Sequence, residues 1–265
     1  MAISRIIAQE HGVIKMKIFL GCPTAKIKSY ALTYYAEGIK KLTFKNIQIL
    51  LADNSSDDSY IAEIREQGLP VIKTPWHPTA RASIVTSRNI LREHFLKSDC
   101  THFFSLEQDV IPAPNVIEKL LFHNVPIISG VYLNMYKTPH GLMKLPVLWG
   151  AVTKAEFDAK KDDSTFQEYL EKEDITDESD MMRKLNFSEV KGSHLLPVMA
   201  CGLGCVLIAR EVVEKVPFRY EPDRICFDDM FFCKDSKNHG YTILCDTAVK
   251  CRHIISGDQW ENITK

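Results

Sequence analysis

Two acidic residues that directly follow an apolar run are the best candidates for chemistry in this sequence. Glu107 and Asp109 come after residues 103–106, which have the composition of a buried strand. Side chains two positions apart in a strand point the same way, so both carboxylates are expected at the carboxyl edge of a sheet. Open α/β sheets bind ligands there, and two carboxylates suit Mg²⁺ or Mn²⁺ with substrate phosphates. The alternative is a polar strand end with two solvated acids.

A second acidic pair, Asp228 and Asp229, interrupts an apolar run between Phe227 and residues 230–232. An acid removed from water favours its protonated form, so its pKa rises toward the range of a general base. The alternative is the first turn of a helix, where acidic side chains interact favourably with the helix dipole.

Two further positions are candidates for nucleotide binding. Asp53 ends the apolar run 46–52 and could accept a hydrogen bond from a nucleobase N–H or a ribose hydroxyl. The alternative is a polar turn in which the next acids, Asp57 or Asp58, cap a helix. Gly202 and Gly204 precede an apolar strand and would let a ligand approach the backbone, or would allow a tight bend.

The histidine at position 253 closes the strand-like run 245–252. Lone histidines are more often structural than functional. Near strand ends that carry carboxylates, however, His253 becomes a candidate metal ligand, because neutral imidazole binds divalent metals well.

The elements that must position these residues alternate between strands and helices through the first half of the chain. Helical spacing predicts a helix capped by Ser29, a helix at 82–96 and a helix with a capping box at Asn115 and Glu118. Strands are predicted at 17–21, 46–52, 70–73, 101–106 and 125–131. This alternation predicts an α/β fold with a single Rossmann-like, mixed but mainly parallel sheet flanked by helices.

The pattern changes in the second half. Residues 134–148 contain Pro139, Gly141 and Pro146 and are predicted to be irregular. Residues 156–180 hold eleven acids against three lysines, so they are expected to form a solvated helix and a mobile loop. Strand-like runs return at 195–208 and 241–251.

Bulk properties limit the classes of function. A net charge of -1 gives no general attraction to nucleic acid, and no apolar run approaches the roughly 20 residues of a transmembrane helix. The 265 residues fit one domain with halves at 16–133 and 134–265, preceded by residues 1–15 as an extension. Eight cysteines without a Cys-x-x-Cys pair and no export signal predict reduced thiols and a cytoplasmic location.

The order of these motifs, from about residue 16 to 255, resembles the family 2 glycosyltransferases and their relatives with the A-type fold. The motifs that carry the resemblance are Asp53 with its polar turn, Arg88 and Asn89 on a helix, Glu107-Gln108-Asp109, Gly202-Leu203-Gly204, Asp228-Asp229 and His253. The likeness lies in order and spacing rather than in one diagnostic motif.

The resemblance implies a role for each matching residue. Asp53 corresponds to the aspartate that binds the base or ribose, and Arg88 and Asn89 to a helix motif near the donor. Glu107 and Asp109 match the Asp-x-Asp motif, with Asp109 as metal ligand and Glu107 departing from the usual Asp. His253 completes the metal site.

The acidic pair and the glycines also have counterparts in the family. Asp229 matches the catalytic base of inverting members, and Asp228 stands where these usually have Glu. Gly202 and Gly204 belong to the donor-binding part of the site.

The implied function is metal-dependent transfer of a sugar from a nucleotide-diphospho-sugar to an acceptor hydroxyl, with inversion. The acceptor would be a glycan, a lipid-linked molecule or a protein, and a lipid-linked acceptor would bring the enzyme to a membrane surface. One alternative is a sugar nucleotidyltransferase, although residues 21–26 lack the glycine run usual after the first strand. Another is a non-catalytic nucleotide- or carbohydrate-binding relative, which would not need Asp109, Asp229 and His253.

Overall fold

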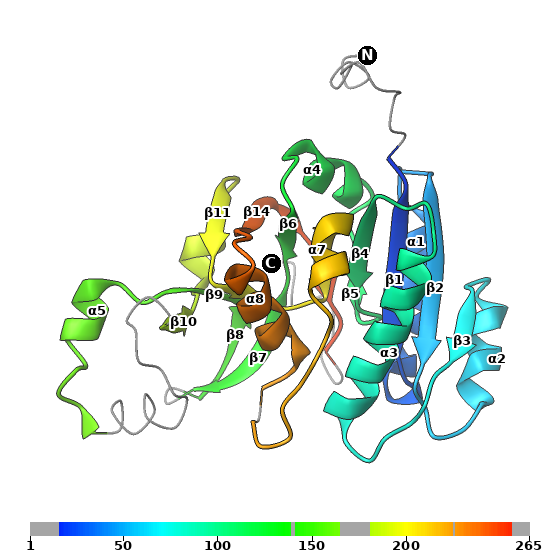
Figure 1. Ribbon diagram of the computed structural model, residues 1–265, viewed down its shortest axis with the longest axis horizontal. Helices are drawn as coiled ribbons and strands as arrows, with labels where there is room; N and C mark the ends of the chain where they lie inside the picture. The colour runs from blue at the N-terminus through cyan, green and yellow to red at the C-terminus, as the bar shows by residue number, and fades with distance from the viewer. Residues whose placement is uncertain (1–15, 139–140, 165–180, 225, 256–265) are drawn as a thin grey trace.

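The computed structural model describes residues 16–138, 141–164, 181–224 and 226–255 (Figure 1). The predicted extension at 1–15 and the greater part of the acidic segment, 165–180, lie outside the described residues. The expectations for those two segments therefore stay predictions.

A central sheet of eight strands forms the framework, in the order β11-β14-β6-β13-β4-β1-β2-β3. Six strands run parallel to one another: β1 (Ile18–Thr24), β2 (Ile47–Asp53), β3 (Val71–Lys73), β4 (His102–Leu106), β6 (Ile127–Val131) and β14 (Ile243–Lys250). Two run antiparallel: β11 (Leu195–Val198) and β13 (Cys205–Ala209). The predicted mixed, mainly parallel sheet is confirmed.

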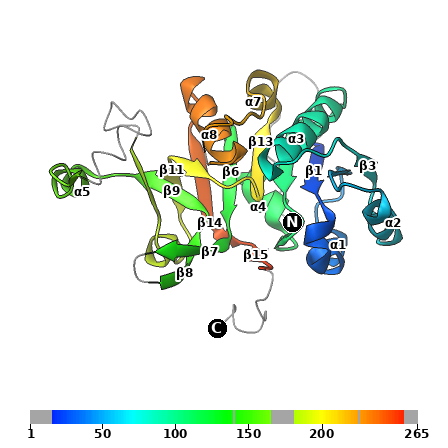
Figure 2. The same ribbon diagram turned by 90° about the horizontal axis from the view of Figure 1, so that it is seen from below.

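Helices cover both faces of this sheet, because side chains along each strand alternate between two apolar layers. Leu20 and Phe104 pack in the layer of α1 (Leu32–Lys40), α2 (Ser59–Glu66) and α4 (Val116–Phe122). Phe19 and Phe103 pack in the opposite layer with α3 (Ala80–Leu96), α7 (Arg210–Lys215) and α8 (Asp228–Asn238). Figure 2 shows α3, α7 and α8 along one side and α1 on the other.

Smaller elements lie at the β11 end of the molecule, where Figure 1 shows β9, β10 and α5 far from β1–β3. A second sheet joins β9 (Leu148–Ala151) to β10 (Met182–Lys184) and β12 (Ala200–Cys201), and α5 spans Lys154–Asp158. Two short pairs complete the fold: β7 (Leu133–Thr138) with β8 (Gly141–Pro146), and β5 (Val110–Ile111) with β15 (Arg252–His253). Two 3-10 helices are η1 (Lys26–Ala31) and η3 (Phe187–Val190).

The prediction of irregular chain at 134–148 was wrong. Gly141 and Pro146 were taken as breakers, but they are the first and last residues of β8. Gly141 has a φ of 101°, which suits the turn into the strand, and Pro146 ends the strand.

Local capping also differs in two places. Ser29 lies inside η1, and α1 begins only at Leu32. Asn115 stands at the N-cap of α4 without a side-chain cap bond, and Glu118 accepts a hydrogen bond from Thr43 at 2.7 Å instead. At α2, Asp58 is the N-cap residue as predicted but its side chain makes no cap bond, and Asp57 Oδ1 accepts a hydrogen bond from the backbone N–H of Ser59 at 2.8 Å.

All eight cysteines are free thiols and six are buried, as predicted. Within the described part of the chain, no helix is long and apolar enough to cross a membrane.

Candidate functional site

A cleft of about 1110 Å³ opens beyond the carboxyl end of β4. It is lined from η1, α3, the turn after β4, β7, β9, β10, α8 and β15, which lie far apart in the sequence. Six of the predicted site residues meet in this cleft: Arg88, Glu107, Asp109, Asp228, Asp229 and His253.

Arg88 joins the two acidic pairs. Its guanidinium, on a side chain only 2% exposed, lies 2.7 Å from Glu107 Oε1 and 2.7 Å from Asp228 Oδ2. It also donates a hydrogen bond to Ser105 Oγ at 2.7 Å, so its three nitrogen atoms all face protein oxygens. Burial alone would lower the pKa of Arg88, but Asp228 and Glu107 raise it above its ordinary value. Arg88 therefore positions Glu107 and Asp228, which lie in different elements.

Asp109 stands at the centre of a second cluster. Its Oδ2 lies 2.9 Å from Lys28 Nζ and 3.3 Å from His253 Nε2, and Tyr30 donates a hydrogen bond to the same oxygen at 3.4 Å. Burial would raise the pKa of Asp109, but hydrogen bonds from His253 and Lys28 outweigh it and lower the pKa to about 2. Asp109 is therefore an ionised carboxylate held among donors.

The short pair β5–β15 brings His253 to this cluster across more than 140 residues of sequence. His253 is paired with Val110, directly after Asp109, and the backbone N–H of Ile254 donates to the Asp109 carbonyl at 2.7 Å. The other ring nitrogen, Nδ1, lies 2.8 Å from the Leu133 carbonyl oxygen, which fixes the ring. Burial alone would lower the pKa of His253, but the hydrogen bond and the charge of Asp109 have the larger opposite effect. The pKa of His253 is therefore raised above its ordinary value.

Asp229 begins the first turn of α8 together with Asp228, and it also lines the cleft. Asp228 and Asp229 therefore both begin a helix and line the cleft, so the two alternatives given by the sequence apply together. Burial, and then the charges of Asp228 and Glu107, raise the pKa of Asp229 to about 7. Such a carboxyl is half ionised near neutral pH and can accept a proton from a substrate.

The arrangement fits a resident divalent ion poorly. Among the residues that the structure describes, no group of three or more His, Cys, Asp or Glu side chains lies close enough to hold a metal. Asp109 and His253 do lie together, but the Lys28 ammonium is 2.9 Å from Asp109 and 3.8 Å from Glu107. A lysine thus occupies the place between the two carboxylates where the sequence predicted Mn²⁺ or Mg²⁺, and the metal stays a prediction.

Two predicted donor-binding residues are engaged by the protein outside the cleft. Asp53 is fully buried, 3.0 Å from Lys73 Nζ, and also accepts a hydrogen bond from the Ser55 backbone N–H at 3.1 Å. Asn89 donates to the Phe218 carbonyl at 2.8 Å and accepts from the Phe218 N–H at 3.1 Å. These bonds tie each residue to neighbouring backbone, and a ligand role stays a prediction.

The two glycines are explained by packing against Tyr132. A Cβ atom on Gly204 would lie 2.6 Å from Tyr132 Cζ, and one on Gly202 would also strike the same ring. The Gly204 N–H donates to the Tyr132 hydroxyl at 3.1 Å. Neither glycine lines the cleft, so the space beside them serves an aromatic side chain of the protein.

Sequence reasoning missed several residues of the cleft. Lys28 and Tyr30 lie in η1, just after the first strand, in a segment where the sequence predicted only a helix cap at Ser29. Lys184 is opposite Trp149 in the β9–β10 pair, with its Nζ 3.2 Å from the Trp149 ring centroid and 3.8 Å from that of Tyr136. Burial lowers the pKa of Lys184 to about 7. No local pattern marked these residues in advance, because their places depend on contacts with distant elements.

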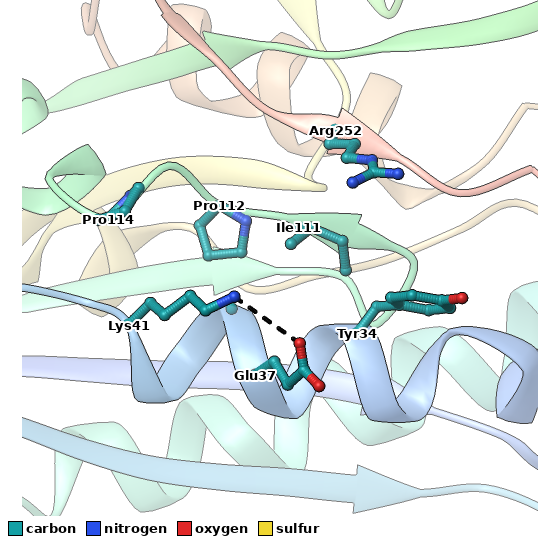
Figure 3. Close-up of a pocket in the computed structure, with 8 residues that line it drawn as sticks. Tyr34, Glu37, Lys41, Ile111, Pro112, Pro114 and Arg252 are labelled. Carbon is teal, nitrogen blue, oxygen red and sulfur yellow. Dashed lines mark ion pairs between the residues drawn. The ribbon is translucent and has the colours of Figure 1, made fainter. Parts of the chain in front are cut away.

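A smaller hollow of about 220 Å³ lies between α1 and β5 (Figure 3). Figure 3 shows Tyr34 and Ile111 in its wall and the ion pair of Glu37 and Lys41, 3.7 Å apart, along α1. None of the predicted catalytic or binding residues lines it, so the larger cleft is the candidate site.

Comparison with known proteins gives evidence on the fold. No protein-family model matches the chain, and no curated protein matches its sequence. Among solved structures, S. aureus TarS residues 1–349 in complex with UDP-GlcNAc aligns with a TM-score of 0.54 and 10% identity, over 94% of this chain and 62% of that chain. A longer S. aureus TarS structure aligns with a TM-score of 0.52 and 12% identity, over 91% of this chain and 37% of that chain.

A third similar structure is A197 from STIV, with a TM-score of 0.43 and 13% identity over 91% of this chain and 87% of that chain. This chain spans less than two thirds of the length of the two TarS chains. TarS is a family 2 glycosyltransferase, and the likeness shows that this chain has a similar, A-type glycosyltransferase-like fold.

Proposed function

We propose that the protein is a glycosyltransferase that moves a sugar from a nucleotide-diphospho-sugar to an acceptor hydroxyl, with inversion at the anomeric carbon. The observation that carries the proposal is the cleft that joins Asp229, a carboxyl with a pKa of about 7, to the charged cluster around Asp109. The fold adds support, because TarS, which has a similar fold, was solved with UDP-GlcNAc.

On the donor side, the nucleoside diphosphate is a leaving group that gains negative charge as the bond to the sugar breaks. Lys28 borders the cleft beside Asp109 and offers N–H donors to phosphate oxygens, and His253, whose two ring nitrogens face Asp109 and the Leu133 carbonyl, adds positive charge there when protonated. Donors fixed in advance stabilise developing charge without reorganisation. Arg88 is buried and bonded to Glu107, so it holds the turn at residues 107–109 in place from the protein interior.

On the acceptor side, Asp229 takes the proton of the acceptor hydroxyl. The hydroxyl oxygen then forms the new bond to the anomeric carbon while the bond from that carbon to the diphosphate oxygen breaks. Attack from the face opposite the leaving group inverts the anomeric centre through an oxocarbenium-like state. Tyr136, Trp149 and Lys184 line the same cleft from β7, β9 and β10, and we assign the acceptor to this wall.

A binding screen tests the proposal directly. Thermal shift and calorimetry with UDP-GlcNAc, UDP-glucose and GDP-mannose, each with and without Mn²⁺, should detect at least one donor. Product analysis distinguishes the alternative class of enzyme, because a sugar nucleotidyltransferase would release pyrophosphate from a nucleoside triphosphate and a sugar 1-phosphate. Binding of no nucleotide-sugar under any of these conditions would rule the proposal out.

A further inference from the structure

We propose that Lys28 supplies the positive charge that holds the diphosphate of the donor, so that nucleotide-diphosphate binding does not require a divalent ion. This inference rests on the proposed function and deepens it, because it identifies the group that takes the place of a metal.

The position of the Lys28 ammonium is the first argument. It lies 2.9 Å from Asp109 Oδ2, 3.1 Å from Asp109 Oδ1 and 3.8 Å from Glu107 Oε2. The remaining oxygen of Glu107 is 2.7 Å from Arg88. A divalent ion bound between the two carboxylates would have to displace Lys28.

A hydrogen bond joins the backbone at Lys28 to the acidic turn, residues 107–109. Gln108, the residue between the two acids, donates from its side chain to the Lys28 carbonyl oxygen at 3.1 Å and also bonds the Tyr60 hydroxyl. The Lys28 N–H donates to the Ala25 carbonyl at 2.9 Å within η1. These bonds fix the segment that carries the ammonium, so its contact with Asp109 is not that of a freely moving surface lysine.

The charges of the site give the second argument. Bare carboxylates would repel a diphosphate, but here Lys28 offsets Asp109, while Arg88 is shared between Glu107 and Asp228. Lys28 is one third exposed and lines the cleft, whereas Arg88 is buried. An ammonium has three N–H donors, so Lys28 can bond Asp109 and still donate to a phosphate oxygen.

Calorimetry of UDP and GDP in EDTA and in MnCl₂ tests the inference on the whole chain. The wild type should bind at least one of them in EDTA, and Mn²⁺ should change the affinity little. Lys28→Met keeps the length but removes the charge, and it should weaken binding in EDTA by roughly 10- to 100-fold, the worth of a charge-assisted hydrogen bond. Mn²⁺ should restore part of this loss, because the substitution frees the carboxylates of Glu107 and Asp109.

Lys26→Met is the matched control, because Lys26 lies on the same 3-10 helix but is exposed and bonds Ser59 instead of the acids. It should leave UDP and GDP affinity unchanged. If Lys28→Met fails to fold, the double variant Lys28→Met/Asp109→Asn removes both partners without stranding a buried charge. The comparison of wild type in EDTA and MnCl₂ needs no variant.

The outcomes separate this inference from the proposed function. Wild-type binding that occurs only with Mn²⁺ would overturn the inference and leave the transferase proposal standing. Unchanged UDP and GDP affinity of Lys28→Met in EDTA would also overturn the inference. Failure of every nucleotide diphosphate and nucleotide-sugar to bind, with or without metal, would remove both.

Discussion

Replacing Asp229 with asparagine should slow catalysis without lowering the stability of the fold. The substitution keeps the shape of the side chain but removes the proton acceptor. General-base catalysis contributes about 10²- to 10⁴-fold in rate, so turnover should fall by that factor while donor affinity stays nearly unchanged. Wild-type turnover should rise with pH and level off above pH 7, because only the ionised form of Asp229, whose pKa is about 7, accepts the proton.

The same substitution should make the protein more stable in alkaline solution. The pKa of Asp229 is raised on folding from the model-peptide value of 3.8 to about 7, so the folded state holds this proton more tightly than the unfolded state. The resulting stability is fully present below the unfolded pKa and is lost as pH rises through about 7. A difference of this size corresponds to on the order of 4 kcal/mol once the carboxyl is ionised.

Urea denaturation at pH 5 to 9 measures this effect without any substrate. The free energy of unfolding of the wild type should fall relative to Asp229→Asn as pH rises toward 7, and the difference should stay level above about pH 7. Asp223→Asn, which changes an exposed acid in the preceding loop, should follow the wild type at every pH. Parallel curves for wild type and Asp229→Asn, or full turnover in the variant, would refute the assignment of Asp229 as a partly buried base with a raised pKa.

Three other predictions concern the framework and the acidic segment. Asp53→Ala should lower the free energy of unfolding by about 1–3 kcal/mol in urea, because it removes the buried partner of Lys73, whose side chain is 32% exposed; an unchanged midpoint would contradict this. Gly204→Ala should cost about 1–3 kcal/mol by the same assay, since its Cβ would strike Tyr132, and a neutral effect would mean that the ring moves freely. Residues 156–180 should exchange amide protons faster than the central sheet in the free protein, because few apolar side chains anchor them, and slow exchange throughout the segment would disprove this.

The sequence was most informative where local pattern and tertiary structure agree. The apolar strands ending at Asp53 and at Glu107 are correctly located, because parallel strands buried on both faces are continuous apolar runs. The place of Asp109 in the cleft followed from the rule that ligands bind at the carboxyl edge of such sheets, whereas the role of Asp229 in the same site was implied by the family resemblance. His253 was a candidate metal ligand from its place at a strand end, and the family resemblance matched it to the ligand that accompanies Asp109.

What the sequence could not provide are contacts set by long-range pairing. The β7–β8 hairpin was missed because Gly141 and Pro146 are turn residues in any local reading, and only pairing across the hairpin makes them the ends of a strand. Lys28 was missed because an exposed-looking lysine after a strand has no local signature; its role depends on the acidic turn 80 residues later. Gly202 and Gly204 were predicted to let a ligand approach the backbone, but the nearby side chain of Tyr132 explains why no Cβ atom fits there.

Release of nucleoside diphosphate tests the central claim most directly. Wild-type protein and Asp229→Asn would be incubated with UDP-GlcNAc and a mixture of sugar and polyol acceptors, with UDP, GlcNAc and glycosylated products separated by chromatography. We predict that the wild type forms UDP together with a glycosylated acceptor, and that the variant forms both at least roughly 10²-fold more slowly. Equal rates for the two proteins, or a wild type that forms no nucleoside diphosphate from any nucleotide-sugar in the donor panel, would contradict the account.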